Sequence, residues 1–200
     1  MSENIDDLIE EIRKRTKGAV SESRYEHSVR VAETAMKLCQ KYGLDEKIGY
    51  LTGISHDMCK ALPEELLISI SSRDGMPVTE LEKKKPALLH GRAAAVKLQE
   101  DFNVADPSVI EAVQTHTFGK VGMCDLSKVL FVADKIEPGR PHVDEEYLKR
   151  LKKLSLNELI LTVLKENVDY LEKKGKSVAP QSLALLEWLQ ETAGGEYEKS

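Results

Sequence analysis

Aromatic residues and cysteines are scarce in this chain of 200 residues. Aromatics make up 5% of it, and its three cysteines, Cys39, Cys59 and Cys124, lie far apart and never in the spacing Cys-x-x-Cys. An odd, scattered set argues against a disulfide framework and against a cysteine-based zinc site. This usage is typical of proteins in a reducing compartment, so we expect a cytoplasmic location.

The chain also lacks long apolar runs and an excess of basic residues. No stretch approaches the roughly 20 apolar residues that span a bilayer, and the acidic, polar N-terminus is unlike a signal peptide. The net charge is −5, whereas general nucleic-acid-binding proteins normally carry a basic surplus. We therefore expect neither membrane nor nucleic acid as a partner, although a local basic pocket is allowed.

The abundant residues favour helices. Leu, Ala, Glu and Lys are frequent, and these residues prefer helix to strand. No repeat or Pro/Gly/Ser-rich linker divides the chain. We predict an all-α bundle in one domain over 1–200, with a core at about 20–140 and C-terminal helices at about 144–192 packed on it. The expected helices cover residues 4–16, 24–42, 45–60, 63–71, 86–101, 107–116, 125–136, 144–153, 155–174 and 180–192. Gly43 is expected to end the second of them, Asp106-Pro107 to start the sixth, and Asp125 or Ser127 to cap the seventh.

Two of these helices carry histidines on faces that are expected to be buried. In 24–42, apolar residues occupy two sides and His27 lies on one of them, so its imidazole points into the protein. In 45–60, Gly49 and Gly53 share a stripe with His56. Each interior glycine costs about 1 kcal/mol relative to alanine, so we expect a neighbouring helix to approach closely there.

The dipeptide His56-Asp57 is the most informative feature of the chain. It is accompanied by further residues of the same chemistry at or near helical segments, namely His27, His90, His116 and Asp134. Imidazole nitrogens and carboxylate oxygens suit a borderline divalent ion such as iron, manganese, cobalt or zinc. A metal held in this way can turn water into a nucleophile at neutral pH. The pattern therefore predicts a metal-dependent hydrolase.

Each of these residues also has an ordinary explanation. His27 alone would be a hydrogen-bonded core histidine, and Asp57 could pair with a nearby lysine. His90 could lie on a helix surface, and His116 as a cation would suit a helix C-terminus. A carboxylate at Asp134 is harder to explain, because it lies on an apolar helix and needs a cation or several donors. One shared site accounts for all five. His142 is interpreted as an ordinary loop histidine.

Five longer strings place these residues in a family context: Arg24-Tyr-Glu-His27, His56-Asp-Met-Cys-Lys60, Leu88-Leu-His-Gly91, His116-Thr-Phe-Gly119 and Phe131-Val-Ala-Asp-Lys-Ile-Glu-Pro138-Gly-Arg140. Their order and spacing over about residues 20–190 resemble the HD-domain phosphohydrolase superfamily. Within it they resemble the YqeK-type symmetrical bis(5′-nucleosyl)-tetraphosphatases. The resemblance implies an HD-domain helical bundle that hydrolyses diadenosine tetraphosphate into two ADP.

The resemblance also implies roles for single residues. Iron or a similar ion would be bound by His27, His56, Asp57 and Asp134. The substrate would be contacted by Arg24, His90, Gly91, Arg92, His116, Thr117, Lys135 and Arg140. Catalysis is expected to involve Asp57, Lys60, His90 and His116. Asp57 would hold or deprotonate the attacking water, while His90 or His116 would steady charge on the leaving phosphate or bind a second ion. A homodimer is expected by family analogy only.

Three other functions fit parts of this pattern. Another phosphohydrolase of the same superfamily, such as a nucleoside monophosphatase, would share the metal ligands and differ in the length of its pocket. A nucleotide sensor with a structural metal would bind ligand without turnover. A helical adaptor with chance histidines would bind no metal at all.

Overall fold

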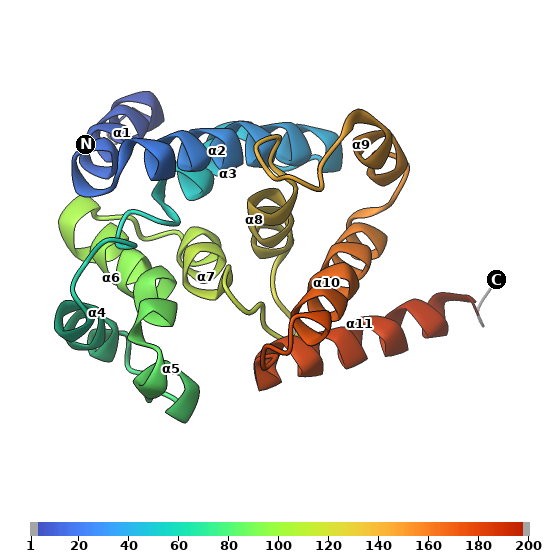
Figure 1. Cartoon of the computed structure of the whole chain (residues 1–200). Coiled ribbons are helices and arrows are strands. Elements are labelled where there is room, and N and C mark those ends of the chain that lie inside the picture. Colours follow the sequence, from blue (N-terminus) through green and yellow to red (C-terminus); the bar gives the residue numbers. More distant parts are fainter. Residues whose placement is uncertain (1–3, 198–200) are drawn as a thin grey trace.

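The computed structural model describes residues 4–197, with side chains as far as Thr192. Helices and turns make up this part of the chain and it contains no strand, so the predicted all-α class is confirmed (Figure 1). None of its helices is long and apolar enough to span a bilayer. In chain order the helices are α1 (Ile5–Ala19), α2 (Glu22–Tyr42), α3 (Glu46–Ser55), α4 (Glu64–Ser71), α5 (Glu80–Lys84), α6 (His90–Phe102), α7 (Pro107–Thr115), α8 (Asp125–Ile136), α9 (Glu145–Leu151), α10 (Leu156–Lys173) and α11 (Pro180–Tyr197), with 3-10 turns η1 (Ser72–Asp74) and η2 (Pro86–Leu89).

The helix predicted over 45–60 is wrong at its end, because α3 stops at Ser55. The imidazole of His56 donates through Nδ1 to the carbonyl of Gly53 at 2.7 Å, the acceptor that the Asp57 amide would use in a longer helix. Tight turns follow, with the amide of Met58 bound to the carbonyl of Ser55. His56 and Asp57 therefore stand at a helix end and can face the same point.

Other elements also differ from the prediction. The helix expected from residue 86 begins as η2, because the Pro86–Leu89 turn precedes α6. The short helix α5 was not predicted. For α8 the predicted caps Asp125 and Ser127 are wrong: Cys124 is the N-cap residue and makes no side-chain capping bond. Instead the carboxylate of Glu111, on α7, accepts the Cys124 amide at 2.7 Å.

The expected close approach at the glycines of α3 is confirmed. A Cβ atom on Gly53 would lie 2.4 Å from the Cα of Ala32 on α2, and one on Gly49 would lie 2.5 Å from Sγ of Cys39. Helices α2 and α3 are thus packed backbone against backbone. This contact brings His27 and His56 together, with ring centroids 5.3 Å apart.

Helix α8 lies between α7 on one side and α10 on the other (Figure 1). An apolar cluster lies on each of these sides, so most of α8 is buried. Its Val129, Leu130 and Ala133 belong to the cluster built with α1 to α4, α6 and α7. Its Phe131 and Val132 belong to a second cluster, built with α9, α10 and α11. The C-terminal helices therefore pack on the rest of the bundle through α8.

Candidate functional site

Four of the predicted metal-binding residues meet where α2, α3 and α8 approach one another. The Nε2 atom of His27 lies 3.1 Å from Oδ1 of Asp134 and 3.9 Å from Oδ2 of Asp57. The Nε2 atom of His56 lies 3.5 Å from Oδ2 of Asp57 and 3.8 Å from Oδ1 of Asp134. Two imidazoles and two carboxylates thus aim at one small volume.

The histidines of this first group are fixed with their lone pairs toward that volume. Because a carbonyl can only accept, the Nδ1 atom of His56 donates to Gly53 and its Nε2 carries no proton in the neutral ring. The Nδ1 atom of His27 donates to Oε1 of Glu137 at 3.1 Å. The Nε2 atom of His27 therefore also carries no proton in the neutral ring. Both Nε2 atoms are buried and have no hydrogen-bond partner among the described residues. A divalent ion fits these orphaned acceptors.

A second group shares Asp57 with the first. Its Oδ1 lies 3.0 Å from Nε2 of His90 and 4.0 Å from Nε2 of His116. Those two Nε2 atoms are 3.0 Å apart, while the Nδ1 atoms donate to the carbonyls of Ala87 and Val113. His27, His56 and Asp57 form one set that could hold an ion, and Asp57, His90 and His116 form another. Asp57 is thus placed as a bridge between them.

The site is a cluster of acceptor atoms, and positive charge would stabilise it. Burial lowers the pKa of His56 and lowers that of His116 well below its usual value, so both rings are neutral near pH 7. Burial alone would raise the pKa of Asp134, but the Lys135 ammonium and the neighbouring histidines together outweigh it, and the pKa stays well below its usual value. The unprotonated nitrogens of neutral imidazoles and ionised carboxylates are all acceptors, so they cannot hydrogen-bond one another, whereas all of them can bind a cation.

Basic side chains surround these acceptors. Arg24 donates to Oδ2 of Asp57 at 3.0 Å, and Arg140 donates to Oδ1 of Asp134 at 2.8 Å. Lys60 lies 3.2 Å from Nε2 of His90, and burial lowers its pKa. Lys135 lies 3.3 Å from Oδ2 of Asp134. An acidic protein thus concentrates positive charge at one place, as binding of a polyphosphate requires.

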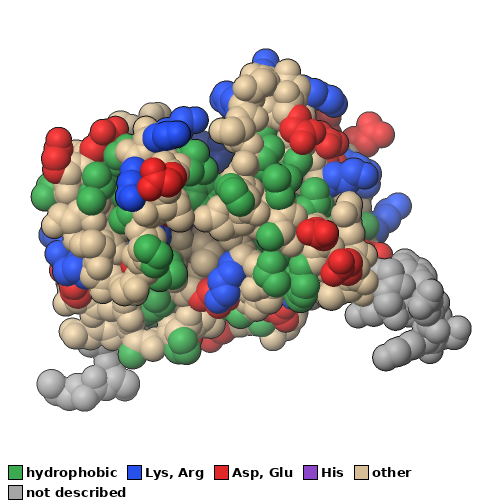
Figure 2. Space-filling model, turned by 90° about the horizontal axis from the view of Figure 1, so that it is seen from below, with side chains coloured by type: hydrophobic (Ala, Val, Ile, Leu, Met, Phe, Trp, Pro, Cys, Tyr) green, Lys and Arg blue, Asp and Glu red, His purple; other side chains and the backbone are tan. Residues whose placement is uncertain are grey.

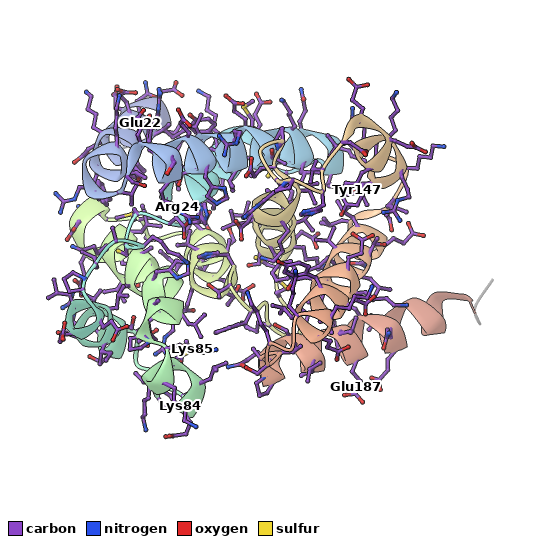
Figure 3. All side chains as sticks on the ribbon, viewed as in Figure 1. Glu22, Arg24, Lys84, Lys85, Tyr147 and Glu187 are labelled. Carbon is purple, nitrogen blue, oxygen red and sulfur yellow. The ribbon has the colours of Figure 1, made fainter. Side chains whose placement is uncertain are left out.

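Asp57, His90, His116 and Asp134 line a cleft of about 950 Å³, whereas the buried His27 and His56 are not among its lining residues. The space-filling view is hollowed along its middle, with basic side chains beside the hollow (Figure 2). Arg24, Lys85 and Tyr147, labelled in Figure 3, line the cleft from α2, the α5–η2 junction and α9. Among the predicted substrate contacts, Arg24, His90, His116, Thr117, Lys135 and Arg140 line it.

Two predicted substrate contacts do not line the cleft, and these assignments are corrected here. Arg92 is 5% exposed and donates to carboxylate oxygens of Asp74 and Glu82 and to backbone carbonyls of the loop before α5. Its guanidinium therefore holds this loop and has no free face for a phosphate. Gly91 serves packing instead, because a Cβ there would lie 2.8 Å from the His116 ring.

Sequence reasoning missed two residues of the site. Glu137 is 2% exposed and binds both His27 and Arg30, at 3.1 Å and 2.5 Å. A carboxylate behind a metal-ligating histidine commonly orients its ring, and the position of Glu137 in the Asp134–Arg140 string was a usable signal. His142, predicted to be an ordinary loop histidine, lines the cleft beside Tyr147, at 5.9 Å between ring centroids.

The chain is similar to several known proteins. The chain matches the HD domain family over residues 24–139. It is 35% identical to the symmetrical bis(5′-nucleosyl)-tetraphosphatase of Bacillus subtilis (strain 168) over 86% of this chain and 92% of that protein. The protein of the same name from Staphylococcus aureus (strain NCTC 8325 / PS 47) is 32% identical over 90% of this chain and 93% of its own length. A solved structure, a predicted HD superfamily hydrolase involved in NAD metabolism from Clostridium acetobutylicum, superposes with a TM-score of 0.83 at 27% identity, over 92% of this chain and 97% of that chain.

Proposed function

The chain belongs to the HD domain family, and we propose that it is a metal-dependent hydrolase of dinucleoside tetraphosphates. It cleaves diadenosine tetraphosphate symmetrically into two ADP, and its relatives from Bacillus subtilis and Staphylococcus aureus are named symmetrical bis(5′-nucleosyl)-tetraphosphatases. One observation carries the proposal. Four histidines and two carboxylates form two adjoining groups of acceptors, and His90, His116 and both carboxylates line a cleft bordered by basic side chains.

The donor sets identify which residues would hold metal. His27, His56, Asp57 and Asp134 would bind one divalent ion, and Asp57, His90 and His116 would bind a second. Mixed nitrogen and oxygen donors suit iron, manganese, cobalt or zinc, and the resemblance to the HD-domain phosphohydrolases favours iron among them. Such ions supply a Lewis acid for a phosphoryl oxygen and acidify a bound water.

The chain's own residues position the reactants and move the proton. An oxygen of Asp57 is placed to hold the attacking water and accept its proton, while Arg24 keeps this carboxylate in place at 3.0 Å. The water oxygen bonds to the phosphorus beside the central bridging oxygen, and the bond from that phosphorus to the bridge breaks. The leaving ADP keeps the electron pair, and Lys60, with a pKa lowered by burial, is placed to protonate or stabilise it.

Basic side chains on both sides of the acceptors suit a long phosphate chain. Arg24, Lys135 and Arg140 would bind phosphate oxygens, and arginine can do so with two parallel hydrogen bonds. Thr117 adds a buried hydroxyl that has no partner among the described residues. Ligand pockets in proteins span roughly 300–1,000 Å³, and this cleft of about 950 Å³ is near the upper limit. Its volume favours a dinucleotide over a nucleoside monophosphate.

Further parts of the proposal concern the whole protein. We propose that residues 1–200 form one domain, of which 1–3 and 198–200 lie outside the described residues. The net charge of −5 supports the absence of nucleic-acid partners, and three free cysteines support a cytoplasmic location. A homodimer is proposed from family analogy, and light scattering on the purified protein tests it.

A product assay tests the function. The protein is stripped of metal by a chelator, reloaded with ferrous, manganous or cobaltous ion, and given diadenosine tetraphosphate in ¹⁸O-labelled water. We expect ADP as the sole nucleotide product, with one labelled oxygen in half of its molecules, because each attack labels one of two identical products. Asp57→Asn, which keeps the size of the side chain and removes its charge, should lose this activity and keep the helical circular dichroism spectrum.

Other products would contradict the proposal in different ways. AMP with ATP would exclude symmetrical cleavage. Phosphate released from a mononucleotide, with the tetraphosphate left intact, would favour a nucleoside monophosphatase. Tight nucleotide binding without turnover under every metal condition would indicate a sensor.

A further inference from the structure

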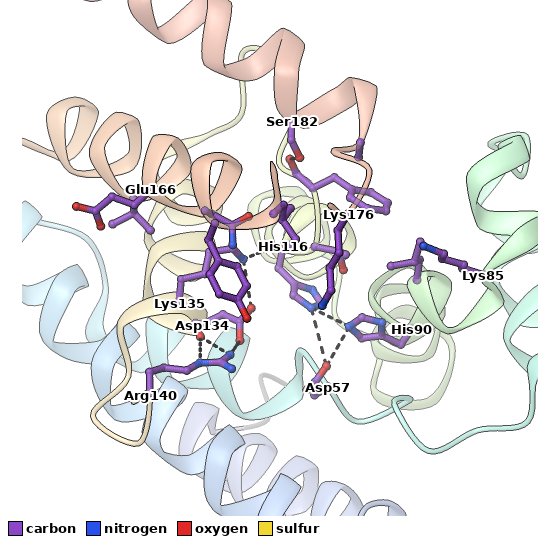
Figure 4. Close-up of a pocket in the computed structure, with 18 of the residues that line it drawn as sticks. Asp57, Lys85, His90, His116, Asp134, Lys135, Arg140, Glu166, Lys176 and Ser182 are labelled. Carbon is purple, nitrogen blue, oxygen red and sulfur yellow. Dashed lines mark hydrogen bonds and ion pairs between the residues drawn. The ribbon is translucent and has the colours of Figure 1, made fainter. Parts of the chain in front are cut away.

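The two sides of the cleft have unlike chemistry. Lys85 and Glu166 stand at opposite sides, with Asp57 and His116 between them (Figure 4). On the Lys85 side the other lining residues are Leu81 and Leu88 of α5 and η2. Leucine offers no hydrogen-bonding group, and the lysine amine can only donate. This side can cover a ligand and can hardly distinguish one nucleobase from another.

The opposite side is built on one face of α10. Its cleft-lining residues recur at helical spacing, as Val163, Glu166, Asn167, Tyr170 and Leu171. The polar residues of this face differ in whether they already have hydrogen-bond partners. Glu166 is held, because its carboxylate accepts from the Tyr147 hydroxyl at 2.6 Å and from Arg150 at 2.9 Å. It therefore braces the Tyr147 ring and has little capacity left for a ligand.

Asn167 and Tyr170 are the two residues of this face whose side chains are available for a ligand. Asn167 is half-buried, and its amide makes no hydrogen bond to any residue in the described part of the chain. Tyr170 is 53% exposed, among the most exposed of the large hydrophobic side chains described. Residues three apart on a helix are neighbours, so a free amide lies beside an open aromatic ring. These are the two elements that hold a base, one by stacking on its face and one by hydrogen bonds to its edge.

Symmetrical cleavage places one nucleoside diphosphate on each side of the Asp57 centre, so each base meets a different side. Resting on the proposed function, we infer that Tyr170 and Asn167 form a subsite that selects adenine in one half of the substrate. The Lys85 side, which is lined by Leu81 and Leu88, accommodates the other base without selecting it. An asparagine amide matches adenine because it accepts from the amino group and donates to a ring nitrogen. Guanine presents two acceptors at the corresponding edge and does not match.

A mixed substrate distinguishes one selective subsite from two. The metal-loaded protein is given diadenosine, adenosine–guanosine and diguanosine tetraphosphates, and kcat/KM is measured for each. We expect the diguanosine compound to be at least about tenfold slower than the diadenosine one, equivalent to about 1.4 kcal/mol. The mixed compound should retain about half of the diadenosine rate constant, because one of its two orientations places adenine at Asn167.

Three variants locate the selection. Asn167→Ala should bring the diadenosine and diguanosine values within about twofold of each other. Asn167→Asp should reverse the preference, because a carboxylate only accepts and guanine presents a pair of donors at its other edge. Leu88→Ala is the matched control on the opposite side, where loss of apolar cover should change kcat/KM for all three substrates by the same factor.

Each outcome decides the inference. Mixed and diguanosine rates that fall by successive equal factors would mean that both sides select, and would overturn it. An unchanged base ratio in Asn167→Ala would overturn it as well, whereas a reversed ratio in Asn167→Asp supports it. Absence of ADP from all three substrates would overturn the proposed function, a failure that is distinct from an unselective but active enzyme.

Discussion

Replacing Gly53 by alanine tests how closely the α2–α3 contact controls the metal site. The added Cβ would lie 2.4 Å from Cα and 2.6 Å from N of Ala32, both of them backbone atoms. Ordinary contact begins at 3.4 Å, so the helices must separate by about 1 Å, and no flexible side chain can absorb this. The carbonyl of Gly53 also holds the ring of His56 at 2.7 Å. The displacement is therefore passed directly to a proposed metal ligand.

Two opposing effects set the change in the free energy of unfolding that Gly53→Ala causes. Overpacking of a close-packed interior costs about 1–3 kcal/mol, and alanine returns up to about 1 kcal/mol of helix propensity over glycine. We expect Gly53→Ala to lower the free energy of unfolding by about 1–2 kcal/mol in urea titrations. Metal affinity, measured by competition with a chromophoric chelator, should fall about tenfold, as when a ligand loses its orientation.

Gly18→Ala in α1 is the matched control for this substitution. A Cβ atom there would meet nothing within 4 Å, so the same change should leave metal affinity unaltered and stabilise the helix by about 0.5–1 kcal/mol. If Gly53→Ala behaved like Gly18→Ala in both measurements, the reasoning about the α2–α3 contact would be refuted.

Three further predictions follow from other contacts. Burial alone would raise the pKa of Glu111, but Lys120 and the Cys124 amide lower it to about 2. The contribution of Glu111 to the free energy of unfolding is therefore present above pH about 4.5 and lost as the pH falls toward 2. After a discount for solvent screening, Glu111→Gln should lower the free energy of unfolding by about 1–2 kcal/mol at pH 7 and weaken its dependence on pH in the acid range. Glu137→Gln should weaken metal binding about 10- to 100-fold in equilibrium dialysis with little loss of helix; unchanged affinity would exclude an orienting role. Arg92→Ala should lower the free energy of unfolding by about 3 kcal/mol or more, because two buried carboxylates lose their cation; a loss below about 1 kcal/mol would contradict this.

Local signals made much of the fold predictable. Apolar residues on two sides of α2 identified a buried helix, and Gly43, whose φ is 72°, ends it as expected. Asp106-Pro107 likewise predicted the start of α7, and the Asp106 side chain accepts from the Ser108 amide. These features depend on a few neighbouring residues and can be read from the chain itself.

The features that were missed depend on distant contacts. Helix α5 has its own capping box at Thr79 and Glu82, but it is too short for a periodic pattern, and Arg92 holds its Glu82 from α6. The start of α8 is capped by Glu111, which is on another helix. Sequence alone placed Arg92 beside the phosphates because it could not show that Asp74 and Glu82 already occupy it.

The candidate site shows the same division. The histidines and aspartates could be selected by chemistry and by resemblance, and the structure brings His27, His56, Asp57 and Asp134 together. The orientation of each imidazole ring could not be derived from the sequence, because it depends on which carbonyl or carboxylate accepts its Nδ1 hydrogen bond. Nor could the sequence reveal the two unlike sides of the cleft, since they combine residues from helices that are far apart along the chain.

Metal stoichiometry tests the central claim most directly. Wild-type protein, His56→Ala and His142→Ala are dialysed against ferrous or manganous ion without oxygen, and bound metal is measured by elemental analysis. We predict one or two ions per wild-type chain, the same number in His142→Ala, which changes a cleft histidine outside both donor sets, and a loss of at least one ion in His56→Ala. Wild-type protein that binds no ion, or His56→Ala that binds as much as wild type, would contradict a metal centre at these residues.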